Sequence, residues 1–173
     1  MPEIGRPQPT EYAPYFERYI SLVPDGDILS VLESQTADVR QALGSLPESR
    51  AGHRYAEGKW SIREVLGHVI DTERVFGYRA LCVARGDQTP LPSFDEKVFA
   101  PNSGHDAIPL AELLEEFENV RRGEVLFFRH LPTEAWTRMG IANNLPVSPR
   151  ALAYNMAGHV LHHLKGLREN YGI

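Results

Sequence analysis

Apolar positions recur every three or four residues along four long stretches of the chain, which is the spacing of helices that each bury one face. The first stretch predicts a helix over 27–43 that ends at Gly44. The second predicts a helix from Ser61 to Arg85, because Ser61 and Glu64 match a capping box. Both helices are long enough to run the length of a small domain.

The third and fourth stretches predict helices over 109–131 and 148–170. Proline stands in the first turn of each, where its missing N–H costs no hydrogen bond. The segment between these two helices is predicted to be a loop, since it shows no strand alternation flanked by hairpin turns. The connection 86–108 is long and rich in proline and glycine, so it can carry the chain back along a whole bundle.

These elements predict an all-α fold, namely a four-helix bundle with a long crossover between the second and third helices. Residues 1–173 are predicted to form a single domain, because the length suits one hydrophobic core. The N-terminal arm, residues 1–24, combines prolines with several aromatic residues. We therefore expect the arm to pack on the bundle, with a short helix over 11–19.

Composition and charge exclude several classes of protein. Apolar residues make up 42% of the chain and charged residues 24%, which is typical of a globular protein with a core. A net charge of -5 argues against nucleic-acid binding, and no apolar run is long enough to span a membrane. The N-terminus lacks a secretory signal, and the one cysteine, Cys82, is expected in the core. We expect a cytoplasmic protein.

Histidine is unusually concentrated near the C-terminus. Of seven histidines, three fall within five residues of the fourth predicted helix: His159, His162 and His163. His159 and His163 lie one turn apart inside the apolar stripe, so their imidazoles can reach a common metal ion. His162 points away from that stripe and is interpreted as a surface or neighbouring residue. The remaining histidines without partner spacing are His53, His105 and His130.

A further histidine, His68, lies at the edge of the apolar stripe of the second helix. If the second and fourth helices are neighbours, three imidazoles converge. Three nitrogen ligands leave one position open for water or substrate, which is typical of a reactive metal site. Spacing alone leaves the alternative that these are hydrogen-bonded core histidines without a metal.

Two motifs carry a family resemblance. One is Lys59-Trp-Ser-Ile-Arg-Glu-Val-Leu-Gly-His68-Val-Ile-Asp71, and the other is Gly158-His-Val-Leu-His-His-Leu164. In this order they resemble the DinB/YfiT-like superfamily, and the resemblance covers nearly the whole chain. It implies a four-helix bundle with a long crossover. It also implies a three-histidine site, commonly holding zinc or nickel, with His68, His159 and His163 as ligands.

The same resemblance implies several activities. Members of the superfamily include thiol transferases that add bacillithiol, mycothiol or glutathione to electrophiles, and a maleylpyruvate isomerase with a thiol cofactor. The first hypothesis is therefore an enzyme whose metal activates a low-molecular-weight thiol for S-transfer to a small-molecule substrate. The alternatives are a hydrolase that uses metal-bound water and a non-catalytic metal-binding bundle. Four-helix bundles often dimerise, so a homodimer is also an expectation.

Four charged residues of the second and third predicted helices bear on the site. Asp71 follows His68 by three positions and can accept its second ring N–H, although a surface position is the alternative. Arg121 falls on the apolar face of the third helix, where it can bind a substrate carboxylate or form an ion pair. Glu73 and Arg79 are expected at the surface.

Overall fold

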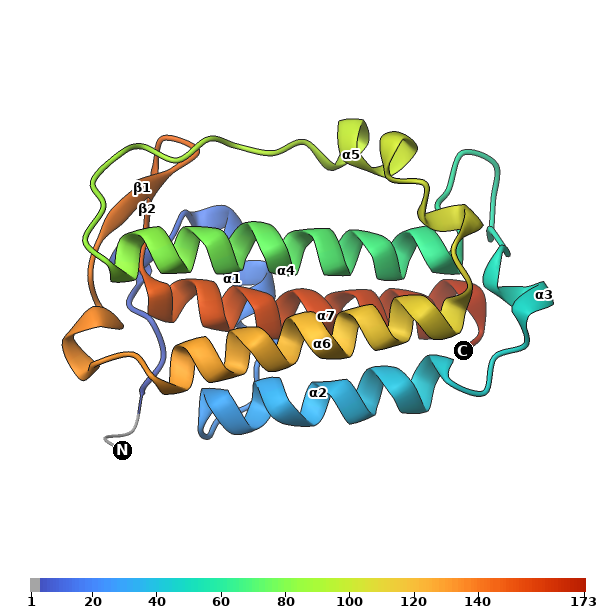
Figure 1. The fold of residues 1–173 in the computed structure, drawn as a ribbon, viewed down its shortest axis with the longest axis horizontal. Helices are drawn as coiled ribbons and strands as arrows, with labels where there is room; N and C mark the ends of the chain where they lie inside the picture. Colours follow the sequence, from blue (N-terminus) through green and yellow to red (C-terminus); the bar gives the residue numbers. More distant parts are fainter. Residues whose placement is uncertain (1–3) are drawn as a thin grey trace.

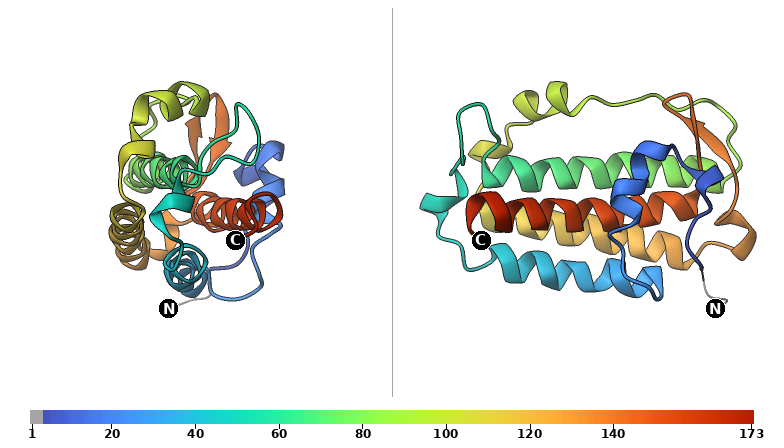
Figure 2. Two further views of the ribbon diagram at one scale, coloured as in Figure 1. Left: turned by 90° about the vertical axis from the view of Figure 1, so that its right-hand side faces the viewer. Right: turned by 180° about the vertical axis from the view of Figure 1, so that it is seen from behind.

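The computed structural model describes residues 4–173, so residues 1–3 of the predicted arm lie outside the described residues. Four long helices lie side by side and confirm the predicted all-α bundle (Figure 1). They are α2 (Ile28–Leu43), α4 (Ile62–Ala84), α6 (Leu110–Arg129) and α7 (Pro149–Tyr171). Seen end-on, α4 and α2 occupy opposite corners, with α6 and α7 between them (Figure 2).

The crossover between α4 and α6 determines the direction of the helices. It runs back along α4, so α4 and α6 point the same way, while α2 and α7 point the other way (Figure 1). The crossover contains a short helix that the sequence did not predict, α5 (Glu96–Ser103), followed by the 3-10 helix η3 (His105–Ala107). Asp95 caps α5 by accepting a hydrogen bond from the backbone N–H of Lys97 at 2.9 Å.

The segment between α6 and α7 forms a hairpin, so the prediction of a loop there is wrong. Strands β1 (Gly140–Ala142) and β2 (Leu145–Val147) pair antiparallel. Asn143 and Asn144 make the turn with φ of 53° and 59°, the left-handed values that a tight hairpin turn requires. Leu91 of the crossover adds hydrogen bonds to the hairpin, which fixes the first part of the crossover beside it.

The N-terminal arm packs on α7 (Figure 2). It contains only short pieces rather than one helix over 11–19: η1 (Pro9–Glu11), η2 (Pro14–Phe16) and α1 (Glu17–Ile20). Gly158 of α7 allows this contact, because a Cβ there would overlap the backbone of Tyr19. The other short helices are α3 (Glu48–Ala51) and η4 (Thr133–Ala135).

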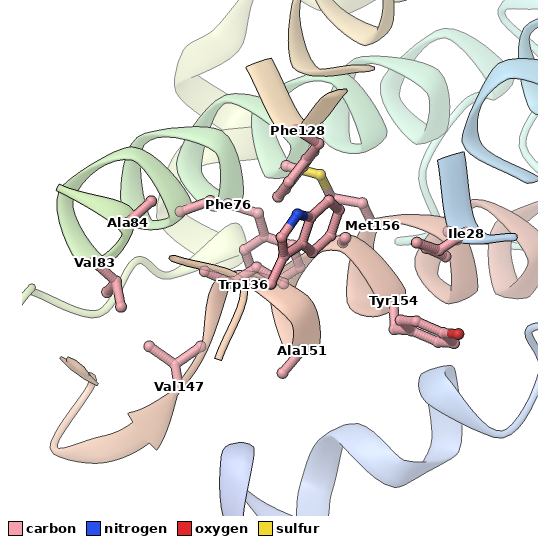
Figure 3. Packing of buried hydrophobic residues seen from close by; sticks show 14 of the residues in the cluster. Ile28, Phe76, Val83, Ala84, Phe128, Trp136, Val147, Ala151, Tyr154 and Met156 are labelled. Atoms are coloured by element: carbon pink, nitrogen blue, oxygen red, sulfur yellow. The ribbon is translucent and has the colours of Figure 1, made fainter. Parts of the chain in front are cut away.

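The buried side chains form two apolar clusters, one toward each end of the bundle. At the hairpin end, Trp136 stacks on Phe128 with ring centroids 5.3 Å apart, and Met156 lies beside them (Figure 3). At the other end, Leu66, Phe117 and other residues of α4, α6 and α7 pack together. Within residues 4–173, no helix is both long and apolar enough to cross a lipid bilayer.

Candidate metal centre

His68 of α4 and His159 and His163 of α7 converge where these two antiparallel helices pack together. The Nε2 atom of His159 lies 3.0 Å from Nε2 of His68 and 3.0 Å from Nε2 of His163. The three ligand atoms all lie within 4.8 Å of one another. The structure thus brings together the three residues that the sequence singled out, and metal binding by them stays a prediction.

The chemistry of this donor set fits a divalent metal ion. Each ring nitrogen of a neutral imidazole carries either one N–H or one lone pair. Nε2 of His159 can therefore form a hydrogen bond with Nε2 of His68 or of His163, but not with both. Nitrogens bound about 2 Å from one ion in a tetrahedral arrangement lie a little over 3 Å apart, close to the spacing seen here. A metal ion would use all three lone pairs at once.

Burial keeps the three histidines neutral. It lowers the pKa of His68 to about 4 and, together with the neighbouring imidazoles, the pKa of His163 to about 3. The pKa of the fully enclosed His159 also lies well below 6.5, for the same reasons. Neutral imidazoles are the form that binds metal, so these ligands need not lose a proton near neutral pH.

A pocket of about 410 Å³ opens beside the site, and both His68 and His159 line it. Its other walls come from the N-terminal arm, the crossover, the hairpin and the facing turns of α4 and α7. Most of these side chains are apolar or aromatic, and they include Tyr12, Phe16, Tyr19, Phe76 and Phe94. His163 faces a smaller hollow of about 260 Å³ on the other side. The larger pocket has the size and lining of a small-molecule site.

Comparison with known proteins places the chain in a family. The sequence profile of the DinB superfamily matches residues 32–166. The chain belongs to the DinB superfamily. A relative from Oceanobacillus iheyensis, named "Putative metal-dependent hydrolase OB0413", is 24% identical over 142 residues, which is 81% of each chain.

Two solved structures share the fold of this DinB-superfamily chain. YfiT from Bacillus subtilis, described as a probable metal-dependent hydrolase with an unusual four-helix bundle topology, has a TM-score of 0.75 at 19% identity. That match covers 98% of this chain and 95% of YfiT. A mycothiol-dependent maleylpyruvate isomerase has a TM-score of 0.68 at 15% identity, covering 84% of this chain and 61% of the isomerase.

Of the two roles considered for Arg121, the structure shows the ion pair, and the residue is fully buried in the bundle of this DinB-superfamily protein. Its Nε and Nη2 each donate to Glu73 at 2.8 Å, and its Nη1 donates to Oε1 of Gln35 at 2.7 Å. The prediction that Arg121 binds a substrate carboxylate is therefore wrong. Glu73 was expected at the surface, and that prediction is wrong because its side chain is only 1% exposed. Glu73 lies on the apolar face of α4, where it pairs with Arg121 on the facing side of α6.

Asp71 makes no hydrogen bond to His68 among residues 4–173, so its predicted role as a hydrogen-bond acceptor for that ligand is not supported. Burial instead raises the pKa of Asp71, while the nearby His105 opposes the rise. His105 is buried against Gly67, where a Cβ would overlap its ring. Sequence reasoning missed this contact, because His105 is in the crossover and shares no helical spacing with α4.

Two features adjoin the three candidate ligands, namely the neighbouring His162 and the second ring nitrogen of His159. His162 is exposed, as its place on the helical wheel predicts, and its ring lies edge-on to Tyr19 at 5.3 Å. Nδ1 of His159 is buried and has no hydrogen-bond partner among the described residues. A ligand histidine usually donates this second N–H, so the centre lacks one of the usual supporting contacts.

Arg79 was expected at the surface, and that prediction is also wrong. Its side chain is 6% exposed and lines the large pocket together with His68 and His159. The sequence held a signal: Arg79 follows His68 by eleven positions, about three helical turns, which returns it to nearly the same face.

Proposed function

We propose that this protein is a metal-dependent enzyme that transfers a low-molecular-weight thiol to a small electrophilic substrate, with His68, His159 and His163 holding the metal ion. One observation carries this proposal: three neutral imidazoles converge beside a pocket that is large enough for a small molecule, and His68 and His159 line its wall. Within residues 4–173, no fourth histidine, cysteine or carboxylate joins the cluster. A structural zinc site would normally have four protein ligands.

The three imidazoles suit zinc or nickel, since both metals accept nitrogen ligands of intermediate softness. When bound, such an ion supplies Lewis-acid chemistry that lowers the pKa of a thiol or a water molecule at its open position. The protein's own contribution is to hold the ligands neutral and to surround the open side with aromatic walls. Phe16, Phe76 and Tyr19 line that side and keep bulk water away from the reacting groups.

One observation supports a thiol rather than water as the nucleophile: a solved neighbour of the same fold is a mycothiol-dependent isomerase. The pocket has room for a small thiol beside the histidines. The second candidate is hydrolysis, in which water takes the place of the thiol. It is favoured by the descriptions of the Oceanobacillus relative and of YfiT as metal-dependent hydrolases.

The deciding experiment measures thiol transfer and hydrolysis on one preparation. The purified protein is loaded with zinc or nickel and incubated with a fluorogenic alkyl halide and glutathione, bacillithiol or mycothiol in turn. We expect metal-dependent conjugation with at least one thiol, lost in His163→Ala and kept in His162→Ala. Conjugation that continues at an unchanged rate after metal removal contradicts metal-dependent S-transfer. Absence of conjugation with all three thiols contradicts it as well. Thiol-independent cleavage of a phenyl ester by the metal-loaded protein would support the hydrolase instead.

A further inference from the structure

Arg79 is a buried cation without a counter-ion in the described part of the chain. Its Nη2 donates a hydrogen bond to the backbone carbonyl of Pro92 at 2.6 Å, and no carboxylate of residues 4–173 forms an ion pair with it. Its guanidinium carbon lies 6.0 Å from the ring centroid of Phe76 and 5.8 Å from that of Phe94. These rings partly compensate the charge. Nε and Nη1 of Arg79 make no hydrogen bond within residues 4–173, and they are not among the fully enclosed polar atoms, so they are accessible from the pocket that Arg79 lines.

Arg121 shows how this bundle normally buries a guanidinium. Its Nε and both terminal nitrogens donate to Glu73, Gln35 or the carbonyl of Leu32. Leaving a buried charge unpaired is costly, so the contrast between the two arginines needs an explanation. The difference between their surroundings is that Arg79 faces the large pocket, where a ligand can supply the missing partner.

Two residues that line the same pocket have an enclosed polar atom without a partner. Within residues 4–173, Oγ1 of Thr72 and Oδ1 of Asn155 make no hydrogen bond, and each residue is only 2% exposed. Thr72 lies one turn beyond His68 on α4, and Asn155 lies one turn before His159 on the antiparallel α7. Both therefore stand between the histidines and Arg79. The polar lining of the pocket thus includes the histidines, Thr72, Asn155 and Arg79, together with Ser93, Glu96 and Asn143, and aromatic walls surround these groups.

We infer that Arg79 binds the carboxylate of an elongated organic acid whose other end reaches the three-histidine site. Oγ1 of Thr72 can donate a hydrogen bond to a polar group in the middle of that molecule, and Oδ1 of Asn155 can accept one from it. Arg79 lies eleven positions after His68 on α4, which is a rise of about 16 Å between their Cα atoms. Because helical side chains lean toward the N-terminus of their helix, the arginine side chain shortens the distance to the histidines. The ligand is therefore extended, about 10 Å long. Only the identity of its far end, a thiol, rests on the proposed function.

Calorimetry on the zinc-loaded protein tests this inference with a matched pair of probes, ω-mercaptooctanoate and ω-mercaptooctanol. They differ only in the charged end. We expect the acid to bind at least about tenfold more tightly than the alcohol, because a charge-assisted pair with Arg79 forms only with the acid. In Arg79→Gln the ratio of the two affinities should fall to near one. Arg74→Gln, which removes a charge from the outer face of α4, should leave the ratio unchanged.

Three results would overturn the inference: equal binding of the acid and the alcohol to the wild type, a ratio that persists in Arg79→Gln, or no binding of the acid at millimolar concentration. If Arg79 only held the crossover through Pro92, Arg79→Gln would weaken both probes equally. If that variant does not fold, the wild-type ratio still decides. Octanoate, which has no thiol, separates the two proposals. Binding of octanoate that depends on Arg79, without any gain from the thiol, supports this inference and contradicts S-transfer.

Discussion

Two sets of polar side chains are buried in this bundle, and they differ in how their hydrogen bonds are satisfied. Around Arg121, the donors of the guanidinium meet Glu73, Gln35 and a backbone carbonyl. Around the histidines, Oγ1 of Thr72, Oδ1 of Asn155 and Nδ1 of His159 have no hydrogen-bond partner in the described part of the chain. A closed network holds helices together, whereas an open one has donors and acceptors left for a ligand. The comparison shows that burial of a charge does not by itself indicate function.

The largest expected effect is at the three histidines, where the polar groups lack hydrogen-bond partners. His163→Ala removes one of three ligands, so the metal content should fall from about one ion per chain to close to none. The helical circular dichroism should stay nearly unchanged, because the packing of the bundle comes mainly from apolar residues. Elemental analysis of the purified variant measures the loss. His162→Ala is the matched control and should keep its metal. Full occupancy of His163→Ala would show that the ligands are assigned incorrectly.

Substitutions in the network around Arg121 should lower the free energy of unfolding and leave the metal content unchanged. Arg121→Met leaves Glu73 buried without its partner, which should cost about 3–5 kcal/mol of unfolding free energy. Urea denaturation measures this loss. Arg74→Met removes an exposed arginine that pairs with Glu116, and it should cost less than about 1 kcal/mol. A loss at Arg121 no larger than at Arg74 would mean that the buried network contributes little.

Glu124, next to the closed network, should make stability depend on pH. Burial and the charge of Glu73 raise the pKa of Glu124 from 4.5 to about 7. The folded state therefore holds a proton that the unfolded state releases between these values, so stability should fall as pH rises from about 5 to 7. We expect a loss of about 1–2 kcal/mol, reduced by partial solvent exposure. Chemical denaturation across this range measures it. Glu124→Gln should remove most of the slope, and an unchanged slope would contradict the assignment.

The smallest effect is expected at Asp71. Because no hydrogen bond joins this carboxylate to His68, Asp71→Asn should change zinc affinity by less than about twofold. Competition with a chromogenic chelator measures the affinity. A loss of tenfold or more would instead show that Asp71 supports a ligand once the metal is bound.

The helices were predictable because their starts are encoded locally. Asp27, Ser61 and Ser148 each accept a hydrogen bond from the backbone N–H three residues later, so these caps appear in the sequence as short motifs. The hairpin was not predictable in the same way. Its turn uses Asn143 and Asn144 rather than the stronger Asn-Gly signal, and its strands are only three residues long.

Helical spacing predicted those residues of the candidate site that share one face of a helix. The periodicity placed His159 and His163 together, and the family resemblance added His68. Periodicity identifies the face on which a residue lies but not what covers that face. Arg79 is buried because Phe94 and Pro92 of the crossover lie over it, and a nonperiodic connection gives no such signal. Arg121 is buried because Glu73 faces it from another helix, a pairing that only the tertiary structure reveals.

The arm that docks on Gly158 gives the pocket a wall that lies outside the four long helices. Tyr12, Phe16 and Tyr19 line the cavity, none of them belongs to the histidine cluster, and the arm has no long helix of its own. Short segments of this kind separate from a folded body at lower free energy than the body needs to unfold. Detachment of the arm would widen the entrance while every histidine stayed in place. The rate at which bulky molecules enter and leave can therefore change through the arm without any change in metal affinity.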